Sequence, residues 1–224
     1  MKASLKPVSV RQKCRKKFLF YFPKGFADGK YVDWERGYKW NAHLEWESLL
    51  DKKQFENLLK AGKFSEIAQR AVKLETRTNL LFSFEKMALR DAVKPARGAR
   101  EFSQGLYQYV YGTEPLQNRF QEFSEVLSRL PVVQTRVHTW PLQTVFGFIA
   151  NPKEHIFLKP RVTQRAAAAY DFPFTYASKP NWDTYRSLLS FAGQIQLDLA
   201  DLHPADYMDL QSFIWVMGSD EYPD

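Results

Sequence analysis

The sequence contains very little cysteine and no long apolar run. Cys14 is the only cysteine among 224 residues, which excludes an internal disulfide framework and fits a reducing compartment. Apolar stretches such as FLFYF (18–22) and FIWVM (213–217) are far shorter than the ~20 residues that a membrane span needs. The first of them stops at Pro23, too early for the apolar region of about 7–15 residues in a secretory signal. We therefore expect a cytoplasmic protein with no membrane partner.

The common catalytic signatures are also missing. The chain has no GxSxG nucleophile motif, no GxxxxGK[ST] phosphate loop and no GxGxxG dinucleotide motif. Its four histidines are scattered, and Cys14 has no second ligand at the spacing of a zinc site. No residue can therefore be assigned a catalytic role, and no cofactor is predicted. The question of catalysis stays open, and we favour a protein that does not catalyse a reaction.

Each end of the chain lacks charge of one sign. Residues 1–17 contain no acidic residue, and residues 187–224 contain no lysine or arginine. The basic residues of the first segment are Lys2, Lys6, Arg11, Lys13, Arg15, Lys16 and Lys17. The acidic residues of the last segment are Asp198, Asp201, Asp206, Asp209, Asp220, Glu221 and Asp224. We predict a basic N-terminal arm over residues 1–17 and a single domain over residues 18–224.

Two main interpretations of the basic arm remain open. In the first, lysine and arginine side chains neutralise phosphates, and the released counterions give an affinity that falls with salt. In the second, the arm docks on the acidic end of its own chain or of a second copy. A merely solvated tail is the third alternative. The sequence alone does not separate these interpretations, since the two ends have equal and opposite charge.

The remaining sequence is rich enough in apolar residues to form a core. Hydrophobic residues make up 45% of the chain and aromatic residues 16%, which excludes a disordered composition. Short apolar runs predict strands near 18–22, within 132–158 and at 213–217. We therefore predict a mainly α-helical domain with a small β-element. Helices are expected over 31–60 (with a break near Asp51), 65–93, 101–111, 115–130, 162–170 and 181–203.

The helix expected over 181–203 has a regular apolar seam. Its apolar residues recur at spacings of three and four, which is typical of a helix that packs against another helix. The seam consists of Tyr185, Leu188, Ala192, Ile195, Leu199 and Leu202. A core helix is the preferred interpretation, because three heptads are too short for an extended coiled coil. A homodimer through this helix is the alternative.

Nucleic acid is the leading predicted partner. The arm, the basic segment KPARGAR (94–100) and the helix over 65–77 would form a phosphate-facing surface. Residues 52–73 fit either a helix-turn-helix or an ordinary αα-hairpin. The predicted contact residues are Arg11, Lys13, Arg15, Lys16, Lys17, Arg70, Lys73, Arg77, Arg97 and Arg100. Tyr21, Phe22, Phe26 and Tyr31 would stack on bases if exposed, and otherwise belong to the core.

An alternative function uses the acidic end. Carboxylates in the last turn of a helix oppose its dipole, so a sequence that keeps Asp198 and Asp201 there has a use for a cation. With Asp206 and Asp209 they would bind Mg²⁺ in an enzyme acting on a phosphorylated or nucleic-acid substrate. That hypothesis requires at least three of these carboxylates to converge on one point. The basic arm and simple solubility are the competing explanations, and a self-associating module is a third candidate function.

Overall fold

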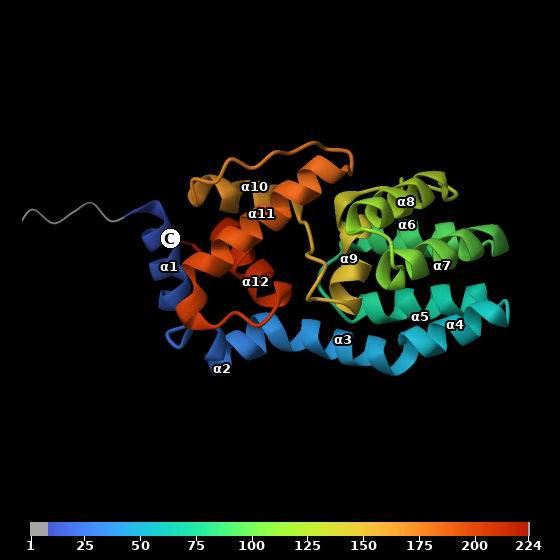
Figure 1. Ribbon diagram of the computed structural model, residues 1–224, viewed down its shortest axis with the longest axis horizontal. Helices are drawn as coiled ribbons and strands as arrows, with labels where there is room; N and C mark the ends of the chain where they lie inside the picture. The colour runs from blue at the N-terminus through green and yellow to red at the C-terminus, as the bar shows by residue number, and fades with distance from the viewer. Residues whose placement is uncertain (1–8, 224) are drawn as a thin grey trace, which may run out of the picture.

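A helix that is buried on every side lies in the middle of the protein. All residues of α9 (Trp140–Ala150) are buried. Its sequence, WPLQTVFGFIA, is predominantly apolar around the whole circumference, as expected of a helix with no solvent-facing side. The computed structural model, which describes residues 9–223, places α9 between two groups of helices (Figure 1).

The elements on either side of α9 are all helical. In chain order they begin with α1 (Val10–Tyr21), the 3₁₀ turn η1 (Gly25–Ala27), α2 (Gly29–Tyr31), the π-helical segment η2 (Val32–Arg36) and α3 (Gly37–Leu50). Next come α4 (Lys52–Lys60), α5 (Phe64–Thr76), α6 (Ser83–Val93), α7 (Ala96–Tyr111) and α8 (Leu116–Arg129). After α9 follow α10 (Pro160–Ala169), α11 (Trp182–Asp198), the 3₁₀ turn η3 (Ala200–Leu202) and α12 (Tyr207–Gly218).

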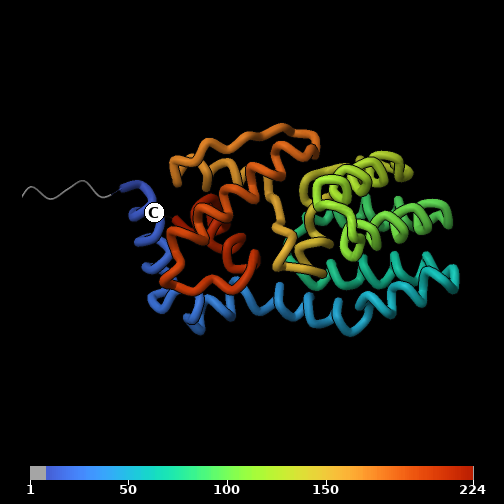
Figure 2. The backbone as a smooth tube through the Cα atoms, viewed as in Figure 1, coloured from blue at the N-terminus to red at the C-terminus, as the bar shows by residue number. Residues whose placement is uncertain are grey.

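The helices form an elongated molecule with a different group at each end. Helices α4 to α8 gather at one end, where α7 packs on α5 and on α8 (Figure 1). Helices α10, α11 and α12 form the other group, with α10 packed on α12 and α1 packed against both. Helix α3 runs along one side of the molecule from one group toward the other. The tube in Figure 2 shows that the C-terminal end of the chain returns beside α1.

The prediction of a mainly helical fold is confirmed, but the strand predicted at 18–22 is wrong. Within residues 9–223 no residue forms a β-strand, and FLFYF continues α1. The buried residues Cys14, Phe18 and Phe22 follow one another at the helical spacing of four, whereas Phe20 points outward. A capping box at Ser9 and Gln12 starts this helix, and it is the local signal that the apolar run obscured.

The other two β predictions are also wrong. Residues 213–217 lie inside α12, where the Asp206 side chain accepts a hydrogen bond from the Met208 amide. Within 132–158, residues 140–150 form α9, and the segments on either side of it have no strand partner. The physical reason is the same in both places. A short apolar run suits a buried strand and a fully buried helix equally well, so periodicity does not distinguish them.

Several helix boundaries differ from the predicted ones. The break near Asp51 is confirmed, because its carboxylate caps α4 by accepting from the Gln54 amide. The helix expected over 65–93 divides into α5 and α6, and the Glu85 side chain accepts from the Phe82 amide where α6 begins. Most of the predicted basic loop, residues 94–100, is the first part of α7. The proposed boundary at residues 17 and 18 falls inside α1.

The apolar seam predicted over 181–203 packs within the same chain, although α11 ends at Asp198 and the last two seam residues, Leu199 and Leu202, lie beyond it. Five of its six residues are buried, and Leu202 is half-buried. Helices α8 and α12 contact α11. Burial by the chain's own helices explains the spacing of three and four without a second copy.

Among residues 9–223, no helix combines the length and apolar character that crossing a bilayer requires.

Candidate nucleic-acid interface

Two arginines of α1 are bound to the acidic end of the chain. Arg11 Nη1 lies 3.2 Å from Asp198 Oδ2. Arg15 donates from Nη1 to Asp201 Oδ1 at 2.8 Å and from Nη2 to Asp201 Oδ2 at 2.6 Å. For these residues the structure therefore shows intramolecular docking of the basic segment on the acidic one. The part of the predicted arm that contains Lys2 and Lys6 lies outside the described residues.

The Arg15–Asp201 pair is open to solvent. The hydrogen bonds from Arg15 lower the pKa of Asp201, and the same bonds raise the pKa of Arg15. The Asp201 side chain is 64% exposed, so water and salt screen its attraction to the guanidinium. Such a bidentate pair orients α1 on α11 and η3 more than it stabilises the fold.

The opposite side of α1 faces an open groove of about 730 Å³. Lys13, Lys16 and Lys17 line it together with Val10 and Phe20. Residues three and four apart share one face of a helix, so these side chains are neighbours. Phe20 is 78% exposed, which is unusual for so large an apolar ring. The groove therefore combines positive charge with an accessible aromatic ring.

The aromatic residues that were predicted near the arm are mostly core residues. Phe22, Phe26 and Tyr31 are buried, and their rings pack edge-to-face or tilted against one another or against Phe18. Tyr21 is half-buried, and its hydroxyl donates to the Pro223 carbonyl at 2.6 Å. The most exposed ring in this region is that of Phe20, which the strand interpretation of 18–22 placed in the core.

Two of the predicted contact residues on α5 and at its C-terminal end bind the neighbouring helix α3 instead. Arg70 donates to the Leu49 carbonyl at 2.7 Å and pairs with Glu66. Arg77 pairs with Glu45 at 2.7 Å. Lys73 is exposed on α5. The contacts of Arg70 and Arg77 join α5 to α3, as in an αα-hairpin that packs on a third helix.

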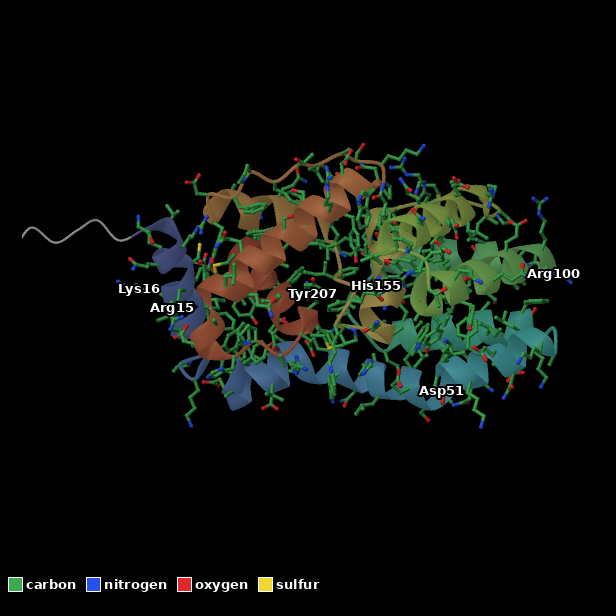
Figure 3. The ribbon with its side chains drawn as sticks, viewed as in Figure 1. Arg15, Lys16, Asp51, Arg100, His155 and Tyr207 are labelled. Atoms are coloured by element: carbon green, nitrogen blue, oxygen red, sulfur yellow. The ribbon has the colours of Figure 1, made fainter. Side chains whose placement is uncertain are left out.

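The structure separates the ten predicted contact residues into distant groups. Arg97 pairs with Glu101 at 2.8 Å, and the Arg100 guanidinium lies 4.9 Å from the centre of the Phe64 ring. Figure 3 shows Arg100 at one end of the molecule and Arg15 with Lys16 at the other. Helix α1, α5 and the start of α7 therefore do not form one continuous phosphate-facing surface.

The four aspartates of the metal hypothesis form two separate arginine-bound sets. Asp198 and Asp201 bind α1, as described above. Asp206 accepts from Arg36 at 2.7 and 3.0 Å, and Asp209 accepts from the same guanidinium at 2.6 Å. In the described part of the chain, no three His, Cys, Asp or Glu side chains converge as a metal site would require. The geometric condition of the Mg²⁺ hypothesis is not met by these residues.

Asp209 lies at the centre of a buried polar network. It also accepts from the Tyr31 hydroxyl and from the Ala205 amide, at 2.6 and 2.7 Å. Burial raises the pKa of Tyr31, and the neighbouring charge of Asp209 raises it further, so the phenol stays protonated as a donor. These contacts tie η2 and α2 to α12. The sequence contains no local signal for them, since the partners are far apart along the chain.

Comparison with known proteins does not assign this chain to a family. No family model, curated protein or solved structure matches the chain.

Proposed function

We propose that the protein binds nucleic acid through the groove of α1. Lys13, Lys16 and Lys17 would contact phosphates, and Phe20 would stack on a base. The observation that supports this proposal best is the position of the exposed Phe20 ring beside three lysines on one helix face. A cationic groove that follows the backbone beside a stacking ring is the usual arrangement for binding a single strand.

The arginines of α1 have a different role in this proposal. Arg11 and Arg15 are neutralised by Asp198 and Asp201, so they hold the helix in place while its lysines face the groove. The two phosphate contacts of Lys13 and Lys16 alone predict a slope of log affinity against log salt of about −1.4 on single strands and about −1.8 on duplexes.

The test is a fluorescence-anisotropy titration of labelled single- and double-stranded DNA and RNA at two salt concentrations. The variant Lys13→Glu/Lys16→Glu should lose binding. The matched control Lys52→Glu/Lys53→Glu makes the same change in net charge on exposed residues of α4. It should retain most of the nucleic-acid affinity. Equal losses in the two variants would show that only net charge matters and would overturn the proposal.

A second pair of variants tests the aromatic contact. Phe20→Ala should weaken single-strand binding by about 1–3 kcal/mol and duplex binding by less. Leu197→Ala removes another exposed apolar side chain, on α11, and should have no effect.

Basic and aromatic residues on one face also suit an anionic lipid surface. Binding to phosphatidylserine vesicles without binding to any oligonucleotide would replace the proposed partner with a membrane.

A further inference from the structure

A small, partly enclosed cavity lies beside η2, and none of the α1 lysines lines it. Its volume is about 220 Å³, and residues from five segments line it. Aromatic side chains form much of the wall: Trp34, Tyr38, Phe82, Phe157 and Trp215. Trp34 and Phe82 are more than half exposed and therefore form the mouth, whereas Phe157 is buried. Flat apolar surfaces on several sides favour a planar ring as the ligand.

One buried acceptor in this cavity has no donor. Gln211, which lines the cavity from α12, is 3% exposed. Its Oε1 atom is buried and, among the described residues, has no hydrogen-bond partner. A buried polar atom without a partner is costly and uncommon in native proteins. An N–H or O–H group of a ligand would satisfy it.

A buried cation lines the same cavity. Lys159 is 8% exposed, and its Nζ donates to the Leu80 carbonyl at 2.9 Å. The same atom lies 3.5 Å from the centre of the Phe82 ring and 3.9 Å from Glu85 Oε2. An ammonium group has three donors, and the Leu80 carbonyl accepts one of them within hydrogen-bond distance. Lys159 therefore retains a donor for a ligand oxygen or nitrogen.

Two other polar groups of the wall already have partners. Glu35 Oε1 accepts from the Tyr222 hydroxyl at 2.6 Å, and its Oε2 lies 3.4 Å from Lys39 Nζ. Trp215 Nε1 donates to Glu221 at 3.2 Å. The wall therefore offers an acceptor from Gln211 and a cationic donor from Lys159, and the polar side chains of Tyr38 and Asn79 also line it.

The backbone that carries Trp34 and Glu35 is unusual. These residues belong to η2, a π-helical segment between α2 and α3. The Gly37 amide closes the turn by donating to the Val32 carbonyl, and a Cβ on Gly37 would lie only 2.9 Å from that oxygen. Glycine therefore permits the π turn. Such turns occur frequently at functional sites.

A lysine connects the cavity mouth with the α1 groove. Lys30 Nζ lies 4.1 Å from the centre of the Trp34 ring and 6.0 Å from the ring centre of Tyr21, a residue of the groove. Lys30 is exposed. Lys30 could therefore pair with a phosphate attached to a molecule in the cavity.

We propose that this cavity binds a single nucleobase by its edge. Gln211 Oε1 accepts a ring N–H, Lys159 Nζ donates to a neighbouring ring carbonyl or nitrogen, and the ring face lies against Trp34. An N–H beside an acceptor on a planar ring is the chemistry of a base edge, and proteins read unpaired bases by this combination of stacking and edge hydrogen bonds. The base enters either as a free nucleoside or nucleotide, or as an unpaired base of a strand. This proposal goes beyond the α1 interface and does not depend on it.

The experiment is isothermal titration calorimetry with the full chain. The ligands are the four ribonucleosides, their 5′-monophosphates and ribose 5-phosphate, which has the phosphate without a base. At least one nucleoside should bind, its monophosphate should bind more tightly, and ribose 5-phosphate should not bind. Gln211→Leu should weaken nucleoside binding roughly three- to tenfold, because it removes one hydrogen bond without adding a charge. Trp34→Ala should weaken it roughly fivefold or more.

Phe20→Ala is the control for these two variants, because Phe20 lies outside the cavity. It should leave nucleoside affinity unchanged, and circular dichroism confirms that each variant is folded. The absence of binding by every nucleoside, or unchanged affinity in both Gln211→Leu and Trp34→Ala, would overturn the proposal.

Two further experiments are needed. One shows whether the base comes from a strand or from a free nucleotide, and the other tests the cavity independently of the α1 interface. A short oligonucleotide whose binding is weakened by Trp34→Ala identifies a strand as the source, and binding of free nucleotides alone identifies a small ligand. Lys13→Glu/Lys16→Glu should abolish oligonucleotide binding through α1 and leave nucleoside binding intact. Nucleoside binding without any oligonucleotide binding would support the cavity and contradict the α1 interface.

Discussion

Arg15 and Asp201 are joined by two hydrogen bonds, of 2.8 and 2.6 Å, across 186 positions of the sequence. With Arg11 and Asp198 they connect the basic first helix to the acidic end of the chain. This pairing decides which cations of α1 are neutralised by the protein itself. Lys13 and Lys16 lie on the side of the groove instead.

Reversing these arginines should loosen α1. In Arg11→Glu/Arg15→Glu, like charges would face each other at Asp198 and Asp201, so amide hydrogen exchange in α1 should accelerate. The charge swap Arg15→Asp/Asp201→Arg should restore protection relative to Arg15→Asp alone. Arg186→Glu serves as the control, because Arg186 pairs with Asp183 within α11. Unchanged exchange in the double reversal would mean that apolar packing of Phe18 and Phe22 alone holds the helix.

Asp209→Asn should destabilise the protein strongly. It removes the charge that faces Arg36 and leaves a single acceptor oxygen for Arg36, Tyr31 and the Ala205 amide, in a site where the carboxylate side chain is only 3% exposed. Arg36 keeps its pair with Asp206, so the expected cost is that of a buried donor left without an acceptor, about 1–3 kcal/mol. Urea unfolding monitored by circular dichroism measures the change. Asp220→Asn, at a side chain that is 79% exposed, should change the free energy of unfolding by less than ~0.5 kcal/mol.

The free energy of unfolding should fall as the pH decreases from about 6.5. Burial lowers the pKa of His155, which packs against the Tyr109 ring, so the folded protein keeps it neutral. The unfolded chain takes up a proton near pH 6.5, and the folded state takes it up only at a lower pH. Stability is therefore complete above that pH and declines below it, by at most about 1.4 kcal/mol per pH unit for this group.

Urea unfolding at pH 8, 6.5 and 5.5 tests this dependence, in a range where ordinary carboxylates do not titrate. His155→Leu should reduce the slope below pH 6.5. His203→Gln, at an exposed histidine, should leave it unchanged. An unaltered slope in His155→Leu would assign the pH dependence to other groups, among which His138 also has a pKa lowered by burial.

Two glycine substitutions should have opposite effects. Gly37→Ala places a methyl group 2.9 Å from the Val32 carbonyl oxygen and should destabilise the protein by about 1–3 kcal/mol. Gly193→Ala, inside α11, meets no atom within 4 Å and should stabilise it by about 0.5–1 kcal/mol. Thermal unfolding of both variants measures the difference. A stabilising Gly37→Ala would show that the π turn relaxes to an α-helix at little cost.

Local patterns predicted the long helices better than the short apolar segments. The seam from Tyr185 to Leu199 and the cap at Asp51 were visible because each depends on residues within a few positions. FLFYF and FIWVM were wrongly assigned to strands. A run of five apolar residues fits a buried helix as well as a buried strand, so the pattern does not distinguish the two. The capping box at Ser9 and Gln12 would have corrected the first assignment, and with it the position of Phe20.

The candidate sites were only partly predictable. Lys13, Lys16 and Lys17 were included from their charge density alone, and the structure places them along one groove. Arg97 and Arg100 were included on the same basis, but both belong to the start of α7, and Arg100 lies at the other end of the molecule (Figure 3). Gln211 and Lys159 had no shared local signal, because α12 and the segment before α10 bring them together only after folding.

The sequence by itself determined the helical character of the chain and the opposite charges of its ends, since both depend on residue type and on short-range spacing. The tertiary structure decided which charges are neutralised, which aromatic ring is exposed and which polar atom remains without a partner. Hydrogen bonds and ion pairs act over a few ångströms in space, whatever the separation along the chain. The association of Arg36 with Asp206 and Asp209 therefore exists only in the folded molecule.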